Sequence, residues 1–226
     1  MLAAAGGDSP EADRALEELC VGYWYPLYAY LRRQGHSRDE AKDLTQELFA
    51  QRVVTRKIFR GVEPGKGKFR TWLLNSLQNF LRNKIDRDKA VKRGGGQPHV
   101  SLDFADGEAR YSIEPASDLT PDRIYEREWV ATVIEFALRA VREQWERAGK
   151  SDVFEVLKIY LPGMLSPPSY SEAAAKLGKS EDAVKMAVSR LKKELGRALR
   201  AEIARTVCDR SEVEEEWQHL LRVVSD

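Results

Sequence analysis

Residues 170–195 read YSEAAAKLGKSEDAVKMAVSRLKKEL, a pattern of two short helices separated by a tight turn. Gly178 can adopt the positive φ that such a turn needs, and Ser180 can cap the second helix. Five apolar side chains can form a small core between the two helices: Ala174, Leu177, Val184, Val188 and Leu191. The pattern therefore predicts a helix-turn-helix.

The second helix of this pattern carries a cationic outer face. The side chains expected on that face are Lys185, Met186, Ser189, Arg190, Lys192 and Lys193. A helix that offers cations and small side chains fits the major groove of B-DNA. The alternative is an αα-hairpin whose basic face is only solvated.

Helix signals also dominate the rest of the chain, and no segment shows a convincing strand alternation. The other predicted helices cover residues 11–34, 38–59, 69–90, 120–149, 151–161 and 211–224. The first of these segments can be one helix or two, with Pro26 marking a start or a kink. Two capping boxes are predicted, Ser37 with Glu40 and Ser169 with Glu172. The helix after 69 has the apolar stripe Trp72, Leu73, Leu77, Phe80, Leu81 and Ile85. The helix after 120 has the stripe Trp129, Val133, Phe136, Ala140 and Val141.

A polar stretch that opens with Gly-Gly-Gly separates the two halves of the chain and reads as a flexible linker. The sequence therefore predicts an all-α protein with two small helical domains, the second of which contains the helix-turn-helix. The expected domains are residues 8–93 and 121–207. The linker is expected at 94–120, and an acidic C-terminal helix at 208–226.

The charge of the chain is divided unevenly. The 226 residues hold 37 Lys+Arg and 36 Asp+Glu, a net charge of +1. Residues 52–93 nevertheless carry thirteen bases and three acids, and residues 176–205 carry nine bases and four acids. Segments 8–47, 98–128 and 208–226 are acidic, with net charges of −4, −5 and −4. Two basic blocks in structured segments favour binding of a polyanion.

The first basic block combines cations with aromatic and amide side chains. Cations follow a phosphate backbone, aromatic rings can stack on unpaired bases, and amides can hydrogen-bond to base edges. The helical spacing of Trp72 and Phe80 fits a hydrophobic core equally well.

An acidic helix face is predicted in the segment DEAKDLTQELF, residues 39–49. Its members are Asp39, Asp43, Gln46 and Glu47, which share one face by steps of three and four. Such a face can dock a basic partner helix or can simply be solvated. No His or further carboxylate completes a metal site.

Several function classes are not favoured by the sequence. The three His residues are dispersed, and there is no nucleophile–base pair and no P-loop, so we expect no enzymatic activity and no cofactor. Cys20 and Cys208 form no Cys/His cluster, which argues against structural zinc and suits a reducing cytosol. No apolar run approaches the ~20 residues of a membrane span, and no secretory signal is recognised. We therefore expect a cytoplasmic protein.

Taken in order, three segments resemble the extracytoplasmic-function (ECF) group of bacterial RNA polymerase sigma factors. Residues 39–49 resemble region 2.2, residues 69–82 (FRTWLLNSLQNFLR) resemble regions 2.3–2.4, and residues 170–193 resemble region 4.2. The resemblance covers about 15–90 and 130–205. The long linker, and the ending AEIARTV followed by an acidic helix, are similar to ECF-like factors of Planctomycetes.

The resemblance implies a sigma factor that binds core RNA polymerase, recognises promoter DNA and helps to melt it. The residues implied to face the coiled coil of the polymerase β′ subunit are Asp43, Gln46 and Glu47. Those implied to bind the opened minus-ten element are Lys68, Arg70, Trp72, Asn79, Arg82 and Asn83. Those implied to face the duplex minus-thirty-five element are Lys185, Met186, Ser189, Arg190 and Lys193. The helix-turn-helix domain is also implied to grip the polymerase β flap.

The sequence departs from the family pattern at Ala173, Met186 and Leu191, so its target DNA cannot be taken from a relative. Two other functions stay open: a helix-turn-helix regulator that acts without polymerase, and a helical adaptor that binds only protein. An anti-sigma factor is left open as a further partner. We also hypothesise that the acidic linker and tail cover the basic faces in the free chain.

Overall fold

A computed structural model of the 226-residue chain describes residues 10–50, 68–90, 111, 119–163, 166–207, 209 and 211–225. Every regular element in these ranges is a helix, which confirms the all-α class. The predicted continuation of the second helix over 51–59 and most of the linker at 94–120 lie outside the described residues. Among the described helices, none has both the length and the apolar character that a membrane span requires.

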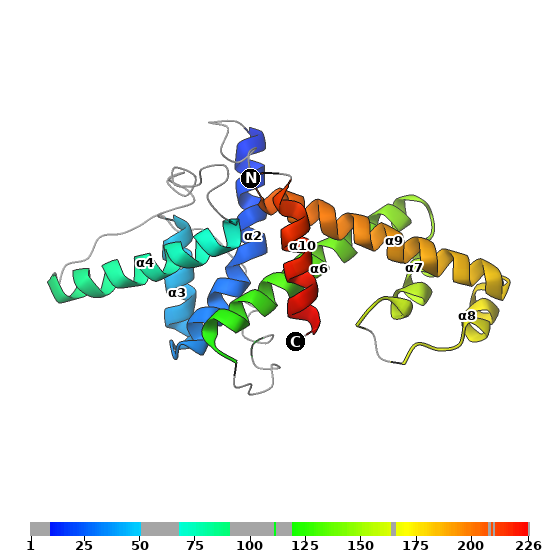
Figure 1. The fold of residues 1–226 in the computed structure, drawn as a ribbon, viewed down its shortest axis with the longest axis horizontal. Coiled ribbons are helices and arrows are strands. Elements are labelled where there is room, and N and C mark those ends of the chain that lie inside the picture. The colour runs from blue at the N-terminus through cyan, green and yellow to red at the C-terminus, as the bar shows by residue number, and fades with distance from the viewer. Residues whose placement is uncertain are drawn as a thin grey trace. The chain divides into compact units, whose positions relative to one another are not determined.

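The chain divides into two compact units, Met1–Thr132 with Ala204–Asp226, and Val133–Ile203. The divisions fall inside two long helices, α6 (Pro121–Arg147) and α9 (Glu181–Thr206) (Figure 1). The first unit therefore includes the start of α6 and the end of α9, which the sequence-based division assigned to the second domain.

Among its described residues, the first unit also contains four further helices. They are α2 (Pro10–Arg33), α3 (Arg38–Leu48), α4 (Phe69–Ala90) and α10 (Glu212–Ser225). Pro26 lies inside α2, which runs on as one helix. The first predicted capping box is confirmed: Ser37 Oγ accepts from the Glu40 amide, and the Ser37 amide donates to the Glu40 carboxylate at 2.9 Å.

Aromatic side chains join the start of α6 to α2 and α4. Trp129 Nε1 donates to Tyr23 Oη at 2.8 Å, and the Tyr23 ring meets Phe69 edge-on with centroids 5.0 Å apart. In α4, Leu73, Leu77 and Phe80 are buried as predicted. The remaining stripe positions differ, since Trp72 and Leu81 are only half-buried and Ile85 is 54% exposed.

The second unit consists of the rest of α6, the helices α7 (Ser151–Leu157) and α8 (Tyr170–Leu177), the 3₁₀ turn Lys158–Tyr160, and most of α9. The buried positions of α6 in this unit are Val133, Ala137, Val141 and Trp145, one every four residues. The predicted stripe was wrong at Phe136 and Ala140, which are half-buried and exposed. The guanidinium of Arg139 covers the Phe136 ring at 5.2 Å, so this ring packs at the surface.

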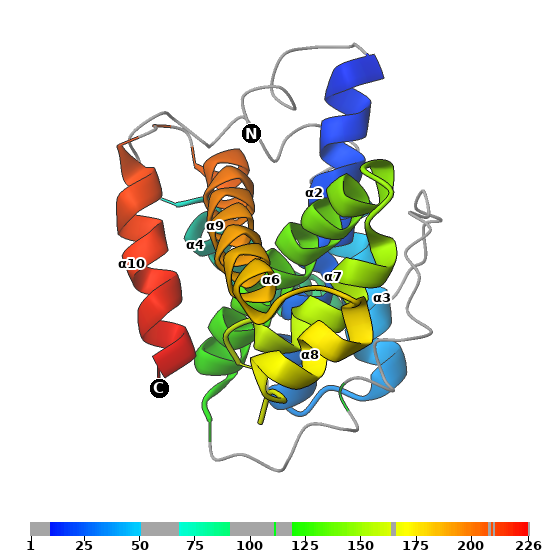
Figure 2. The ribbon, with the colours of Figure 1, turned by 90° about the vertical axis from the view of Figure 1, so that its right-hand side faces the viewer.

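Helices α8 and α9 form the predicted helix-turn-helix, with α8 beside the N-terminal end of α9 (Figures 1 and 2). Gly178 ends α8 at φ +61°, and Ser180 Oγ accepts the Ala183 amide at 3.3 Å. Ser169 caps α8 by accepting the Glu172 amide at 3.2 Å. Four of the five predicted core residues are buried, Ala174, Val184, Val188 and Leu191, and Leu177 is half-buried.

Gly178→Ala and Gly196→Ala should change stability in opposite directions. Neither new Cβ would meet an atom within 4 Å, so backbone conformation decides the sign. At Gly178 the positive φ makes alanine unfavourable by about 1–2 kcal/mol. At Gly196, inside α9, alanine should stabilise the helix by about 0.5–1 kcal/mol. Urea unfolding followed by circular dichroism measures both; equal shifts would contradict the left-handed turn.

Candidate nucleic-acid and polymerase interfaces

The outward face of α9 gathers the residues predicted to meet duplex DNA. Met186 is 75% exposed, and Ser189 and Arg190 are exposed beside it. A shallow hollow of about 440 Å³ is lined by Tyr170, Val188 and four polar residues of this face, Lys185, Ser189, Lys192 and Lys193. The start of α9 therefore presents cations, a hydroxyl and an apolar tip together.

Acidic neighbours on α9 orient two of these cations. Lys185 Nζ lies 2.8 Å from Glu181, and this carboxylate raises the pKa of the Lys185 ammonium. Arg190 Nε donates to Glu194 at 2.8 Å. Glu194 is buried and also accepts from Trp145 Nε1 at 2.6 Å. Burial acts to raise the pKa of the Glu194 carboxyl, but the hydrogen bonds from Arg190 and Trp145 outweigh it and hold that pKa below its usual value.

A second polar face lies along α4. Asn79, Arg82 and Asn83 are exposed, with Arg82 Nη1 3.5 Å from Asn79 Oδ1. Trp72 is half-buried and stacks on Phe69, with ring centroids 5.9 Å apart and planes 19° from parallel. Steps of seven and four residues place Trp72, Asn79 and Asn83 on one side of the helix, here called the outer face of α4.

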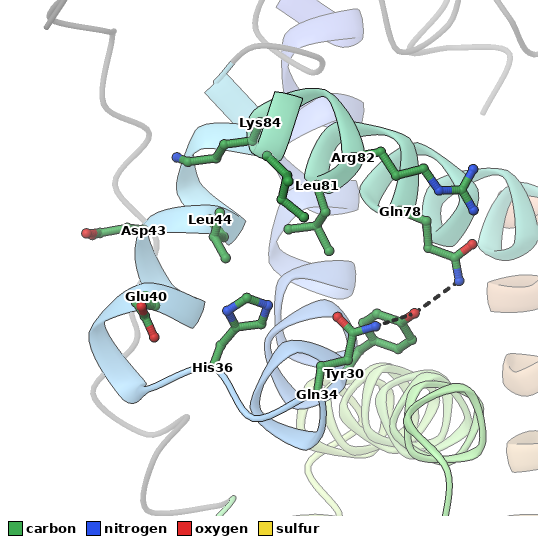
Figure 3. A pocket seen from close by; sticks show the side chains of 11 residues that line it. Tyr30, Gln34, His36, Glu40, Asp43, Leu44, Gln78, Leu81, Arg82 and Lys84 are labelled. Carbon is green, nitrogen blue, oxygen red and sulfur yellow. Dashed lines mark hydrogen bonds between the residues drawn. The ribbon is translucent and has the colours of Figure 1, made fainter. Parts of the chain in front are cut away.

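The predicted polymerase-facing residues occupy α3. Asp43 is exposed, and Figure 3 shows its carboxylate pointing outward, away from the neighbouring Leu44. Gln46 and Glu47 are half-buried, and Glu47 is ion-paired to Lys84 of α4. The structure thus brings the three together on one helix face, with one carboxylate directed to solvent and the other tied to α4.

A cavity of about 670 Å³ opens beside Asp43, between α2, α3 and α4 (Figure 3). Leu44, Leu81 and Ile85 give it an apolar part. On its α2 side, Gln34 and Gln78 each donate to Tyr30 Oη at 3.0 Å. The cavity can hold an apolar side chain of a partner whose basic groups face Asp43.

Lys68 and Arg70 were predicted to bind the opened minus-ten element together with the residues of the outer face of α4. In the structure both instead bind Glu216 of α10. Arg70 Nε and Nη2 donate to the two Glu216 carboxylate oxygens at 2.8 and 3.3 Å, and Lys68 Nζ lies 2.9 Å from Oε1. Arg70 is 8% exposed and Glu216 is 1% exposed. Burial acts to raise the pKa of the Glu216 carboxyl, but the two cations outweigh it and hold that pKa below its usual value.

Further groups complete this charged cluster. Arg70 Nη1 donates to Glu126 at 3.1 Å, and its guanidinium lies 5.3 Å from the centre of the Trp129 ring. His219 Nε2 is 3.5 Å from the same Glu126 carboxylate. Burial, together with the positive charge of Arg70, lowers the pKa of the His219 imidazole.

Sequence reasoning missed Glu216 and Glu126 as partners of Arg70, and His219 as a neighbour of Glu126. A helical-wheel signal for the central pair existed, since Arg70 is in step with Leu73 and Leu77, the buried stripe of α4. Glu216 is likewise three residues from Val213 and four from Leu220. Two opposite charges, each inside an apolar stripe, indicate a buried ion pair.

Comparisons with family models, with curated proteins and with solved structures found no match for this chain. Within the described residues, no group of three or more His, Cys, Asp or Glu is placed to hold a metal ion.

His219→Gln should remove part of the acid sensitivity of the protein. The pKa of His219 is lower in the folded chain than its ordinary value of 6.5, so the unfolded chain binds this proton more readily. Its contribution to stability is therefore complete above pH 6.5 and is lost as the pH falls through the folded pKa. Urea midpoints at pH 7.5 and 5.5 should differ less in the variant than in the wild type; an unchanged difference would contradict this reading.

Proposed function

We propose that this protein is a sigma factor of the ECF type, which binds core RNA polymerase in the cytoplasm, directs it to promoters and helps to open them. The observation that carries the proposal is the helix-turn-helix with its exposed face of Lys185, Met186 and Ser189. The order of the three segments that resemble sigma regions supports a sigma factor over a simpler regulator. No cofactor or metal is required for this activity.

The minus-thirty-five element would lie against the start of α9. Lys185, Lys193 and Arg190 offer cations to phosphates and to guanine edges, which are the contacts that position and specify a helix in the major groove. The apolar tip of Met186 suits a thymine methyl group. Glu194 accepts a hydrogen bond from Arg190 Nε. This bond sets the direction in which the rest of the Arg190 guanidinium points.

The minus-ten element would lie along the outer face of α4. Exposed Asn79 and Asn83 can hydrogen-bond to base edges, and the half-exposed Trp72 can stack on an unpaired base. Arg82 adds a cation for the backbone. This chemistry suits a single strand, whose bases are accessible, and gives the helix a role in melting that a duplex-only regulator does not need.

Core polymerase would dock on α3. The outward carboxylate of Asp43 offers a charge to a basic helix, and Leu44, Leu81 and Ile85 offer an apolar recess beside it. Glu47 is fixed by Lys84, so this face is arranged before a partner arrives. The β′ coiled coil would bind here, and the second unit would bind the β flap.

Run-off transcription with purified core polymerase from the native host tests the whole proposal. The full chain should produce promoter-specific transcripts from genomic fragments, whereas core polymerase alone should not. A regulator that acts without polymerase would instead bind specific duplex DNA tightly by itself. Absence of any promoter-specific transcript, together with no binding to core, would overturn the proposal in favour of a helical adaptor.

Trp72→Ala should slow promoter opening more than it weakens polymerase binding. Stacking on an aromatic ring is worth about 1–3 kcal/mol per base, which corresponds to roughly a 5- to 150-fold slower opening. Opening can be followed by the fluorescence of 2-aminopurine placed in the minus-ten element, and core binding by competition with a labelled wild-type chain. Thr71→Ala, at the exposed neighbouring position, is the control. A parallel loss of both activities in Trp72→Ala would contradict the stacking role.

A further inference from the structure

The carboxylate of Glu216 occupies an anion site made by two cations at the start of α4. Three donors converge on it, Arg70 Nε at 2.8 Å, Arg70 Nη2 at 3.3 Å and Lys68 Nζ at 2.9 Å. A bidentate guanidinium together with a lysine ammonium is an arrangement by which Arg and Lys bind a phosphate in nucleic-acid complexes. A carboxylate held in this way stands where one phosphate could be held.

The two cations have different positions on α4. Arg70 belongs to the buried stripe with Leu73 and Leu77, and besides Glu216 it contacts Glu126 and the Trp129 ring. Lys68 is four residues before Trp72 and so lies in step with the outer face of α4. Arg70 therefore anchors Glu216. Lys68 is the cation of the outer face that Glu216 neutralises.

Further carboxylates near Glu216 make the start of α10 resemble a polyanion. Glu212, Glu214 and Glu215 accompany Glu216 in the first turns of the helix. Glu215 is 72% exposed at its side chain, with Oε2 3.6 Å from Lys68 Nζ. Because α10 follows α9 after only a few residues, its effective concentration at the site is high, of the order of millimolar for a short tether.

We propose that Lys68 is a phosphodiester-binding residue for single-stranded DNA, and that α10 competes with the DNA backbone for it through Glu216. In the free chain the internal carboxylate holds the site and weakens DNA binding. When a strand lies along Trp72, Asn79 and Asn83, its backbone displaces Glu216 from Lys68. The ligand assignment rests on the proposed function, since DNA is the polyanion that this function supplies.

The experiment measures binding of a fluorescein-labelled, mixed-sequence 20-nucleotide single strand to the full chain by fluorescence anisotropy over a series of salt concentrations. Glu216→Gln should bind more tightly by about 5-fold or more, the lower end of the usual coupling between two linked sites. The slope of log K against log salt should become steeper by about 0.7, which is the release expected for one added phosphate contact.

Glu214→Gln is the matched control, because it removes the same charge from an exposed position of α10 whose carboxylate accepts from Gln218. It should change the affinity much less than Glu216→Gln. Adding Lys68→Gln to Glu216→Gln should abolish the gain. Equal effects of the two glutamate variants, or a gain that survives Lys68→Gln, would overturn the proposal.

Hydrogen exchange of the wild-type chain keeps the test independent of any loss of folding in Glu216→Gln. Saturating single strand should increase exchange at the α10 amides while α3 is unchanged; full protection of α10 in the DNA complex would overturn the proposal. If promoter-specific transcripts are found without these effects, the competition between α10 and DNA is disproved and the sigma function is retained. If Glu216→Gln binds single-stranded DNA more tightly but no transcript is found, the phosphodiester site at Lys68 is supported and the sigma function is disproved.

Discussion

The buried ion pair between Glu216 and Arg70 is the constraint on which the first unit depends. Its partners lie 146 residues apart and are almost entirely withdrawn from water. Removing a charge from water costs several kcal/mol, and this cost is offset only when both partners and their remaining hydrogen bonds are in place. Arg70 meets this condition with Glu216, Glu126 and the Trp129 ring, so α4, α6 and α10 have to assemble together.

This constraint changes the meaning of the basic block at 52–93. Its thirteen bases and three acids give a net charge of +10, but this count does not show the direction in which each cation points. Arg70 faces the interior and Lys84 is paired with Glu47, whereas Arg82 is exposed on the outside of α4. Among the cations of this block whose side chains the structure describes, Arg82 is therefore the one that is exposed on α4 and offered to a nucleic acid.

Local signals predicted most of the fold. The caps at Ser37, Ser169 and Ser180 and the turn at Gly178 depend on residues within four positions of one another, and all are present. The helical wheel indicates that Arg70 and Glu216 are each buried, but which helices meet, and so which residues pair with Arg70, does not follow from a local pattern. The outward positions of Asp43 and Met186 could be predicted from helical steps alone, whereas the cavity beside Asp43 required the packing of three helices.

A helix with one buried and one outward cation at its start can couple the binding of α10 to the binding of a DNA strand. Arg70 holds Glu216 on the inner side, and Lys68, in step with Trp72 and Asn79 along α4, binds the same carboxylate. Coupling is reciprocal, so in the proposed competition a strand that binds Lys68 would weaken the Glu216–Lys68 contact, and loss of that contact would strengthen binding of the strand. Under the proposed competition, a partner that draws Glu216 from Lys68 would strengthen DNA binding without touching DNA, so the acidic tail would be a point at which polymerase or another protein acts.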